Sequence, residues 1–173
     1  DRFVDVTPHR TELPAVYNNY DRLGKDSANA ANDNLRALLN PLYGTSFCLC
    51  DALDEEAYRG AEQVVILSAS SKTAIGLAYG LSQLEGERPS IIGLTSPANT
   101  DFVTRVETYD VVLGYDQIDK LENHPSLMVD MSGNRAVIGA VHALLGDNML
   151  WCHNVGLTHW DDEAYKSDPV ADQ

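Results

Sequence analysis

The chain has 173 residues, with 44% apolar residues and a formal net charge of -14 from 26 acidic and 12 basic side chains. This charge opposes a sizeable contact with nucleic acid or an anionic lipid surface, and no apolar run is long enough to span a membrane. The length fits one compact soluble domain. Three cysteines without a recognisable framework, and no stretch that resembles a signal peptide, predict a cytoplasmic protein.

Residues 1–33 read as a lead-in segment. They contain Pro8, Pro14 and Gly24 together with many Asn and Asp residues, and only short apolar pieces. This composition predicts loops or stray strands more than a self-sufficient unit. Because the chain opens on an Asp without an initiator Met, we also expect a processed form or a fragment of a longer protein.

A helix is predicted through Leu35–Leu39, capped by Asn32 or Asp33 and ended or kinked by Pro41. A second short helix from Thr45 to Leu53 follows, although the run Phe47–Cys50 also fits a strand. In a helix Cys48 and Cys50 point to different sides; in a strand they share a face but lack two further metal ligands nearby. We therefore interpret both cysteines as small buried hydrophobic residues.

The stretch Gln63–Leu84 combines a strand, a tight turn and a helix. Val64–Leu67 is a short, β-branched apolar run, and from Thr73 onward apolar residues recur at helical spacing up to Leu84. The turn between them, Ser68–Lys72, consists mostly of small residues. Such a turn lets a ligand approach the backbone closely, and the helix start offers unpaired N–H groups and a positive dipole end. This combination suits a phosphate group.

Four further buried strands alternate with helices along the rest of the chain. One helix is expected from Asp101 to about Thr108, capped by Asn99 or Thr100 and with Phe102 inward, and another across Val137–Leu145. The alternation predicts an α/β, Rossmann-like doubly wound parallel sheet of five strands in the order 3-2-1-4-5, with helices on both faces and a ligand crevice at the carboxyl ends. We expect this domain to span residues 34–160, followed by an acidic, loose tail at 161–173. The strands are Ser90–Thr95, Val111–Leu113, Leu127–Asp130 and Met149–Cys152.

The strand-to-helix turn lacks the glycines of a dinucleotide-binding fingerprint. Its three tight positions are Ala69, Ser71 and Ala74. One alternative is a small-residue turn that only packs the helix on the sheet. A nucleotide-hydrolysing phosphate loop is the less favoured alternative, because no glycine-rich segment precedes Ser71–Thr73.

The tip of the next strand reads Thr95-Ser96-Pro97, without an Asp or Glu. An acidic residue at this position normally binds a free ribose diol, so neutral hydroxyl side chains favour NADP(H) over NAD(H). Lys72 either supplies positive charge at this edge or is a solvated lysine on the first helical turn.

Four motifs carry a resemblance to a known superfamily: SASSKTAIGLA at 68–78, IGLTS at 92–96, VDMSGN at 129–134 and VGLTHW at 155–160. Residues 34–160 resemble the cofactor domain of the medium-chain dehydrogenase/reductase superfamily, nearest its quinone-reductase-like branch. More closely, these motifs are similar to an uncharacterised family within it. The resemblance implies an NADP(H)-binding domain of a zinc-independent oxidoreductase that acts on a small-molecule carbonyl or activated alkene.

The resemblance also implies a cofactor site. The turn itself contributes Ala69, Ser70 and Ala74, and Thr95 follows at the neighbouring strand tip. Asn99 stands where relatives often carry a phosphate-binding lysine. The remaining positions are Ser71, Lys72 and Thr73 for the pyrophosphate, Ser96 and Tyr115 for the adenosine 2′-phosphate, Ser132 and Gly133 for the nicotinamide half, and Val155 and Gly156 at the fifth-strand edge.

Superfamily members carry a barrel-like catalytic domain before the cofactor domain, so residues 1–33 would be its remnant. His159 is the candidate acid catalyst, with a satisfied structural histidine as the alternative for it and for His142 and His153. The five histidines show no metal spacing, and we expect no metal. A second hypothesis is a Rossmann-like domain without catalysis that serves as a dimerisation or regulatory module. In either case a homodimer would form by pairing of the exposed fifth strands.

Overall fold

The computed structural model describes residues 2–22 and 30–156. The chain divides into two compact units, Asp1–Asn40 and Pro41–Gln173. In the first, β1 (Arg2–Val4) pairs antiparallel with β2 (Asn19–Asp21), and two short 3-10 helices, Pro8–Arg10 and Ala15–Asn18, lie between them in the chain. The ring of Phe3 stacks on that of Tyr20 at 5.1 Å. These short elements match the expected stray strands, while an origin in a catalytic domain stays a prediction.

Helix α1 (Ala30–Glu55) runs without a break through Pro41. Of the two outcomes expected at Pro41, an end of the helix is therefore wrong. The predicted helix over Thr45–Leu53 is confirmed as part of α1, and the alternative strand at Phe47–Cys50 is wrong. Proline removes only one backbone hydrogen bond, and burial of an apolar face supplies most of a helix's stability. The buried side chains of Cys50 and Leu53 provide such a face in the second half of α1. The predicted caps Asn32 and Asp33 lie inside the helix, because it begins at Ala30.

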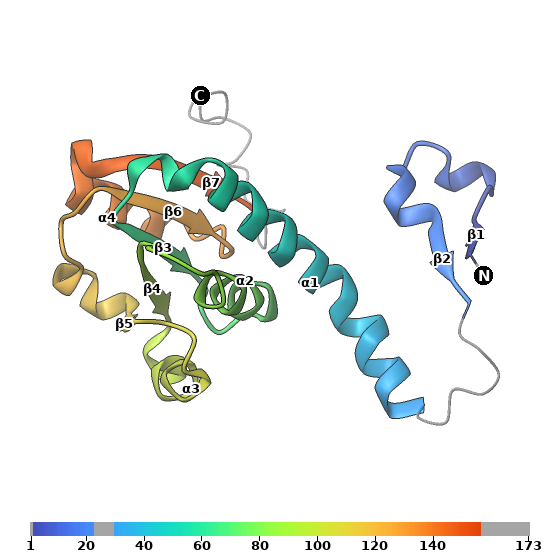
Figure 1. Ribbon diagram of the computed structural model, residues 1–173, viewed down its shortest axis with the longest axis horizontal. Coiled ribbons are helices and arrows are strands. Elements are labelled where there is room, and N and C mark those ends of the chain that lie inside the picture. Colours follow the sequence, from blue (N-terminus) through green and yellow to red (C-terminus); the bar gives the residue numbers. More distant parts are fainter. Residues whose placement is uncertain (1, 23–29, 157–173) are drawn as a thin grey trace. The chain divides into compact units, whose positions relative to one another are not determined.

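The second unit is built on a five-stranded sheet whose strands are all parallel. Their order is β5-β4-β3-β6-β7, which is 3-2-1-4-5 counted along this sheet, as the sequence predicts (Figure 1). The doubly wound, Rossmann-like fold is thus confirmed. The strands are β3 (Gln63–Leu67), β4 (Ser90–Thr95), β5 (Val111–Gly114), β6 (Ser126–Asp130) and β7 (Met149–Asn154).

Helices cover both faces of this sheet. The second half of α1 and helix α2 (Lys72–Ser82) pack on one face, against side chains of β3, β4 and β6. Helix α4 (Arg135–Leu145) packs on the other face, together with Leu121. All residues of β3 and β6 are buried, which explains why both strands read as uninterrupted apolar runs. Short 3-10 helices complete the unit at Ala57–Gly60, Pro97–Asn99, Tyr115–Lys120 and Gly146–Asn148.

Helices α1 and α2 approach closely at two glycines. A Cβ at Gly76 would lie 2.7 Å from the Ser46 hydroxyl oxygen, and one at Gly80 would lie 3.1 Å from the Cys50 sulfur. Ser46 also donates a hydrogen bond of 2.8 Å to the main-chain carbonyl of Thr73. Through this contact α1 supports the first turn of α2, where the candidate site begins.

Two details of the helices differ from expectation. Helix α3 (Thr100–Val106) stops before the predicted end near Thr108, because the next residue, Glu107, adopts the left-handed conformation (φ 58°). Phe102 on this helix is 45% exposed instead of pointing inward. Cys48 is exposed on α1, whereas Cys50 is buried and burial raises the pKa of its thiol, so only Cys50 is the buried small residue that was predicted. The spacing of apolar residues along a helix does not show which of their side chains become buried against another element.

No helix among residues 2–22 and 30–156 has both the length and the apolar character needed to cross a membrane.

Candidate functional site

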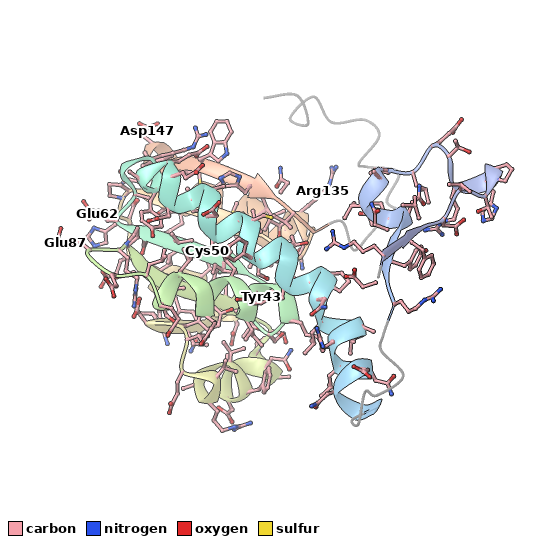
Figure 2. The ribbon with its side chains drawn as sticks, turned by 45° about the vertical axis from the view of Figure 1, so that its right-hand side comes forward. Tyr43, Cys50, Glu62, Glu87, Arg135 and Asp147 are labelled. Carbon is pink, nitrogen blue, oxygen red and sulfur yellow. The ribbon has the colours of Figure 1, made fainter. Side chains whose placement is uncertain are left out.

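The predicted cofactor residues lie where the parallel strands end. β3 is the central strand, with β4 on one side and β6 on the other. The strand order therefore reverses at β3, and the carboxyl end of such a switch point is where doubly wound sheets bind ligands. Figure 2 shows Arg135, which follows the turn after β6, at this carboxyl edge. Glu62 and Glu87, which precede β3 and β4, lie at the opposite edge (Figure 2).

The β3–α2 turn exposes a capped helix start. Ser68 adopts the left-handed conformation (φ 56°), and its carbonyl accepts a 2.8 Å hydrogen bond from the Ser71 N–H. Ser71 is the N-cap: its hydroxyl oxygen accepts from the Ala74 N–H at 3.2 Å. The Ser71 side chain is therefore turned onto the helix, which leaves the first-turn N–H groups of Lys72 and Thr73 without intrahelical partners. A helix start of this kind attracts an anion.

Ala69 and Ala74 serve as packing residues under this turn, and both are fully buried. The Ala69 N–H donates to the Leu94 carbonyl at 3.0 Å, and the Ala69 carbonyl accepts from the Tyr109 hydroxyl at 2.9 Å. A Cβ on Gly93 would lie 3.0 Å from that of Ala69 and 2.8 Å from the Tyr109 ring. Burial raises the pKa of Tyr109, which keeps its hydroxyl a hydrogen-bond donor. Sequence reasoning had assigned no role to Tyr109.

Three predicted residues from the turn and the β4 tip meet at Ser70. Its hydroxyl oxygen lies 3.3 Å from the hydroxyl of buried Thr95 and 3.2 Å from the amide nitrogen of Asn99, and both can donate to it. The two strand ends are thus tied together by neutral groups. The side chain of Ser96, the next residue after Thr95, is half-buried at the same tip.

Tyr115 reaches from the end of β5 to the turn. Its hydroxyl oxygen accepts a 3.0 Å hydrogen bond from the Ser68 N–H, 47 positions away in sequence. Burial is the main cause that raises the pKa of this tyrosine, which keeps the hydroxyl neutral. The side chain therefore fixes the left-handed residue of the turn, a contact that the sequence did not indicate.

The second half of the predicted site is organised by Asp130, at the end of β6. One carboxylate oxygen accepts from the Ser132 N–H at 2.8 Å and the Ser132 hydroxyl at 2.7 Å, and the other accepts from the Gly133 N–H at 3.0 Å. The Asp130 main-chain carbonyl accepts from the N–H groups of Val155 and Gly156 at 2.9 and 3.0 Å.

Asp130 is only 2% exposed. Four predicted site residues therefore converge on one buried aspartate to which sequence reasoning had given no role. The sequence does indicate a role for Asp130 by its position: it is an acidic residue at the end of an apolar strand, and Ser132 and Gly133 follow it closely.

The histidines give no catalytic cluster in the part of the chain that is described. His159 lies outside the described residues, and His142 is exposed on α4. His153, on β7, has a buried Nε2 without a hydrogen-bond partner among the described residues, and whether it is a satisfied structural histidine stays a prediction. Burial lowers the pKa of His153, which favours its neutral form. Within residues 2–22 and 30–156, no group of three or more His, Cys, Asp or Glu side chains is placed to hold a metal ion.

Comparisons with known proteins place the chain in a family. No curated protein matches it. Among solved structures, a cobalt- and zinc-bound thermostable alcohol dehydrogenase from Pyrobaculum aerophilum matches 58% of this chain with 16% sequence identity and a TM-score of 0.42. The match spans 32% of that alcohol dehydrogenase chain, about a third of its length. The family model described as "Protein of unknown function (DUF2855)" matches residues 1–172, so the chain belongs to this family.

Proposed function

We propose that the α/β unit binds NADP(H) across the carboxyl edge of its sheet, as the cofactor domain of a zinc-independent oxidoreductase of the carbonyl- or activated-alkene-reductase type. The observation that carries the proposal is the β3–α2 turn, a serine-capped helix start at the switch point of a doubly wound sheet. When bound, the nicotinamide supplies the hydride chemistry, and the protein binds and orients it.

The residues present fit such a cofactor. The Ser71 side chain folds back onto the helix, so it leaves the N–H groups of Lys72 and Thr73 accessible to a pyrophosphate. The β4 tip carries Ser96 and no carboxylate, which removes a like-charge repulsion against a 2′-phosphate. Asp130 holds the loops that would face the nicotinamide half, and His159 remains the proposed acid.

Loss of the Lys72 charge is expected to weaken NADPH binding about fivefold at low salt, because one exposed ion pair contributes up to about 1 kcal/mol. Lys72 is exposed on the first turn of α2. The measurement is a titration of the chain followed by NADPH fluorescence, with a thermal-shift assay in parallel, on wild type and Lys72→Gln.

The matched control is Lys120→Gln, which makes the same substitution at the end of the 3-10 helix Tyr115–Lys120. It should bind NADPH like the wild type. If the wild type shows no fluorescence or thermal response to millimolar NADPH, or if both variants lose affinity equally, the proposal is overturned.

The alternative function, a Rossmann-like module for dimerisation or regulation without catalysis, is favoured by the β7 edge. Within the described residues β7 pairs only with β6, and Leu150 and Trp151 are 39% and 40% exposed on it. A second copy could add its own β7 there and continue the sheet. This proposed homodimer is compatible with both functions.

Leu150→Lys is expected to convert such a dimer to a monomer, because a lysine on an edge strand opposes strand pairing. Light scattering coupled to size-exclusion chromatography measures the change. Phe102→Lys, an equally large charge introduction at an exposed position of α3, should leave the dimer intact. A nucleotide-insensitive dimer supports the module, whereas a monomeric wild type rules out this interface.

A further inference from the structure

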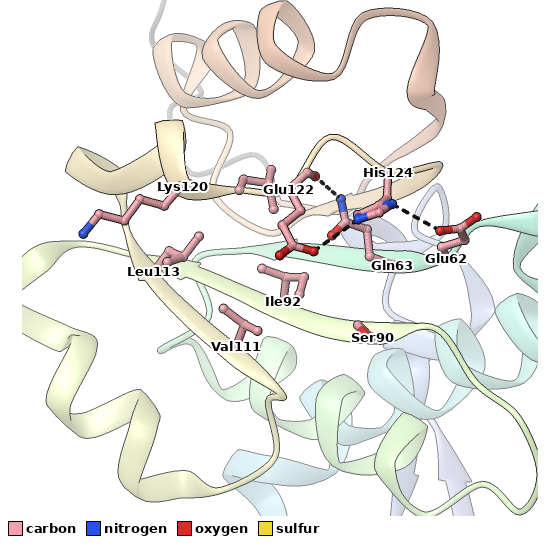
Figure 3. Close-up of a pocket in the computed structure, with 10 residues that line it drawn as sticks. Glu62, Gln63, Ser90, Ile92, Val111, Leu113, Lys120, Glu122 and His124 are labelled. Atoms are coloured by element: carbon pink, nitrogen blue, oxygen red, sulfur yellow. Dashed lines mark hydrogen bonds and ion pairs between the residues drawn. The ribbon is translucent and has the colours of Figure 1, made fainter.

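A pocket of about 270 Å³ lies at the opposite, amino-terminal edge of the sheet (Figure 3). Its walls come from the starts of β3 and β4, from β5, and from the segment that leads into β6. The volume is just under the roughly 300 Å³ at which typical ligand pockets begin, so it suits a small molecule. The proposed nucleotide site, at the carboxyl ends of the same strands, does not use it.

One wall of the pocket is apolar. Ile92 on β4 lies opposite Val111 on β5 in the parallel register, and Leu113 follows two residues later on the same face. Leu121 adds a fourth apolar side chain and is 5% exposed. Val111 is 43% exposed on an edge strand, so part of this apolar surface faces solvent. Covering Val111 with an apolar group would remove this surface from water, which favours binding.

The rim of the pocket carries two carboxylates with one histidine between them. His124 Nδ1 lies 3.3 Å from a carboxylate oxygen of Glu62, and His124 Nε2 lies 3.1 Å from one of Glu122. Each carboxylate can accept several hydrogen bonds, and both glutamate side chains are largely exposed, so the contact with His124 leaves room for a further donor on each. Figure 3 shows the Glu122 carboxylate over Ile92, whereas the Lys120 side chain extends away from both glutamates.

The position of this rim is fixed by a buried polar side chain. Gln63 is 4% exposed, and its amide nitrogen donates to the Glu122 carbonyl and to the Ser126 hydroxyl, both at 2.8 Å. These bonds hold the main chain of Glu122 against the start of β3. The pocket is thus a supported structure with negative charge beside an apolar wall.

We propose that this pocket binds a small organic cation, a primary ammonium or guanidinium group on a short apolar chain. The cationic head donates hydrogen bonds to the carboxylate oxygens of Glu122 and Glu62 that His124 leaves free, and the apolar part covers Val111 and Leu113. The net charge of -14 also draws cations toward the protein. The inference is independent of the proposed cofactor.

The test is a titration of the full chain with hexylammonium chloride at low salt, followed by two-dimensional NMR. Hexanol and hexanoate serve as probes of matched length. We expect saturable shifts at Val111, Leu113 and Glu122 with hexylammonium, weaker binding of hexanol, and the weakest of hexanoate. Absence of saturable shifts with hexylammonium, or equal binding of all three probes, overturns the proposal.

Two variants locate the binding. Glu122→Gln should weaken hexylammonium binding about fivefold, because an exposed ion pair contributes up to about 1 kcal/mol. Asp101→Asn removes the same charge at the exposed start of α3, on the carboxyl side of the sheet, and should not weaken it. Glu122 is exposed and the substitution is isosteric, so folding is retained. An unchanged affinity in Glu122→Gln contradicts the proposal, and the NADPH titration on the same samples reports separately on the carboxyl edge.

Discussion

Replacement of Asp130 by alanine is expected to lower the free energy of unfolding of the α/β unit by about 3 kcal/mol. The carboxylate is 2% exposed and accepts hydrogen bonds from both the backbone and the side chain of Ser132 and from the backbone of Gly133. Without it, these donors lose a charged acceptor in a place with little room for water. Urea unfolding followed by far-UV circular dichroism measures the change.

Two further variants separate the charge from the shape of this side chain. Asp130→Asn keeps the volume but turns an amide N–H toward the Gly133 N–H, so it should cost less than the alanine variant, about 1 to 2 kcal/mol. Asp119→Ala removes an exposed carboxylate of the 3-10 helix Tyr115–Lys120 and should stay within about 0.5 kcal/mol of wild type. If Asp130→Ala is as stable as Asp119→Ala, Asp130 does not organise this edge.

The sheet could be predicted because its residues follow local rules. β3 and β6 are buried along their whole length, so they appear in the sequence as short continuous apolar runs. Alternation with helices and the right-handed crossover then leave few possible strand orders. In the observed register Leu67 lies beside Leu94 and Asp130, so the predicted site residues that follow these strand ends gather at one edge.

The contacts inside the site could not be predicted in the same way. The Tyr109 hydroxyl reaches the Ala69 carbonyl across 40 positions, and the Tyr115 hydroxyl reaches the Ser68 N–H across 47. The position of a tyrosine in the strand pattern does not show whether its hydroxyl will bond to the protein's own backbone or to a ligand. Pro41 illustrates the opposite case: a strong local rule predicted a helix end, and packing of the same helix further along overrode it.

The small residues of the turn divide into two roles that only the structure separates. Ala69 and Ala74 are fully buried and support the packing of α2 on the sheet. Ser70 and Ser71 use their hydroxyls within the protein, one to join the β4 tip and the other to cap α2. What the turn offers to a ligand is therefore its backbone and the charge of Lys72, which explains how a glycine-free turn can still suit a phosphate.

Introduction of a carboxylate at the β4 tip is expected to reverse the proposed preference for NADP(H). In Ser96→Asp the new charge lies at the strand end where a ribose 2′ substituent would be recognised. At an effective dielectric constant of about 20 and a separation of about 7 Å, two unit charges repel by about 2 kcal/mol, or roughly 30-fold in the dissociation constant. The carboxylate would also accept hydrogen bonds from the free diol of NADH, so NADH should bind more tightly than to the wild type.

The control for this reversal lies on the same strand. Ser90→Asp makes the same substitution at the exposed amino-terminal end of β4, so it adds the same charge to the protein at the opposite edge. It should lower NADPH affinity less than twofold at moderate salt, because charges separated by more than about 10 Å are largely screened. Equal losses in the two variants would mean that net charge alone acts on the cofactor. A Ser96→Asp protein that still prefers NADPH would show that the 2′-phosphate is not bound at the β4 tip, whatever the β3–α2 turn binds.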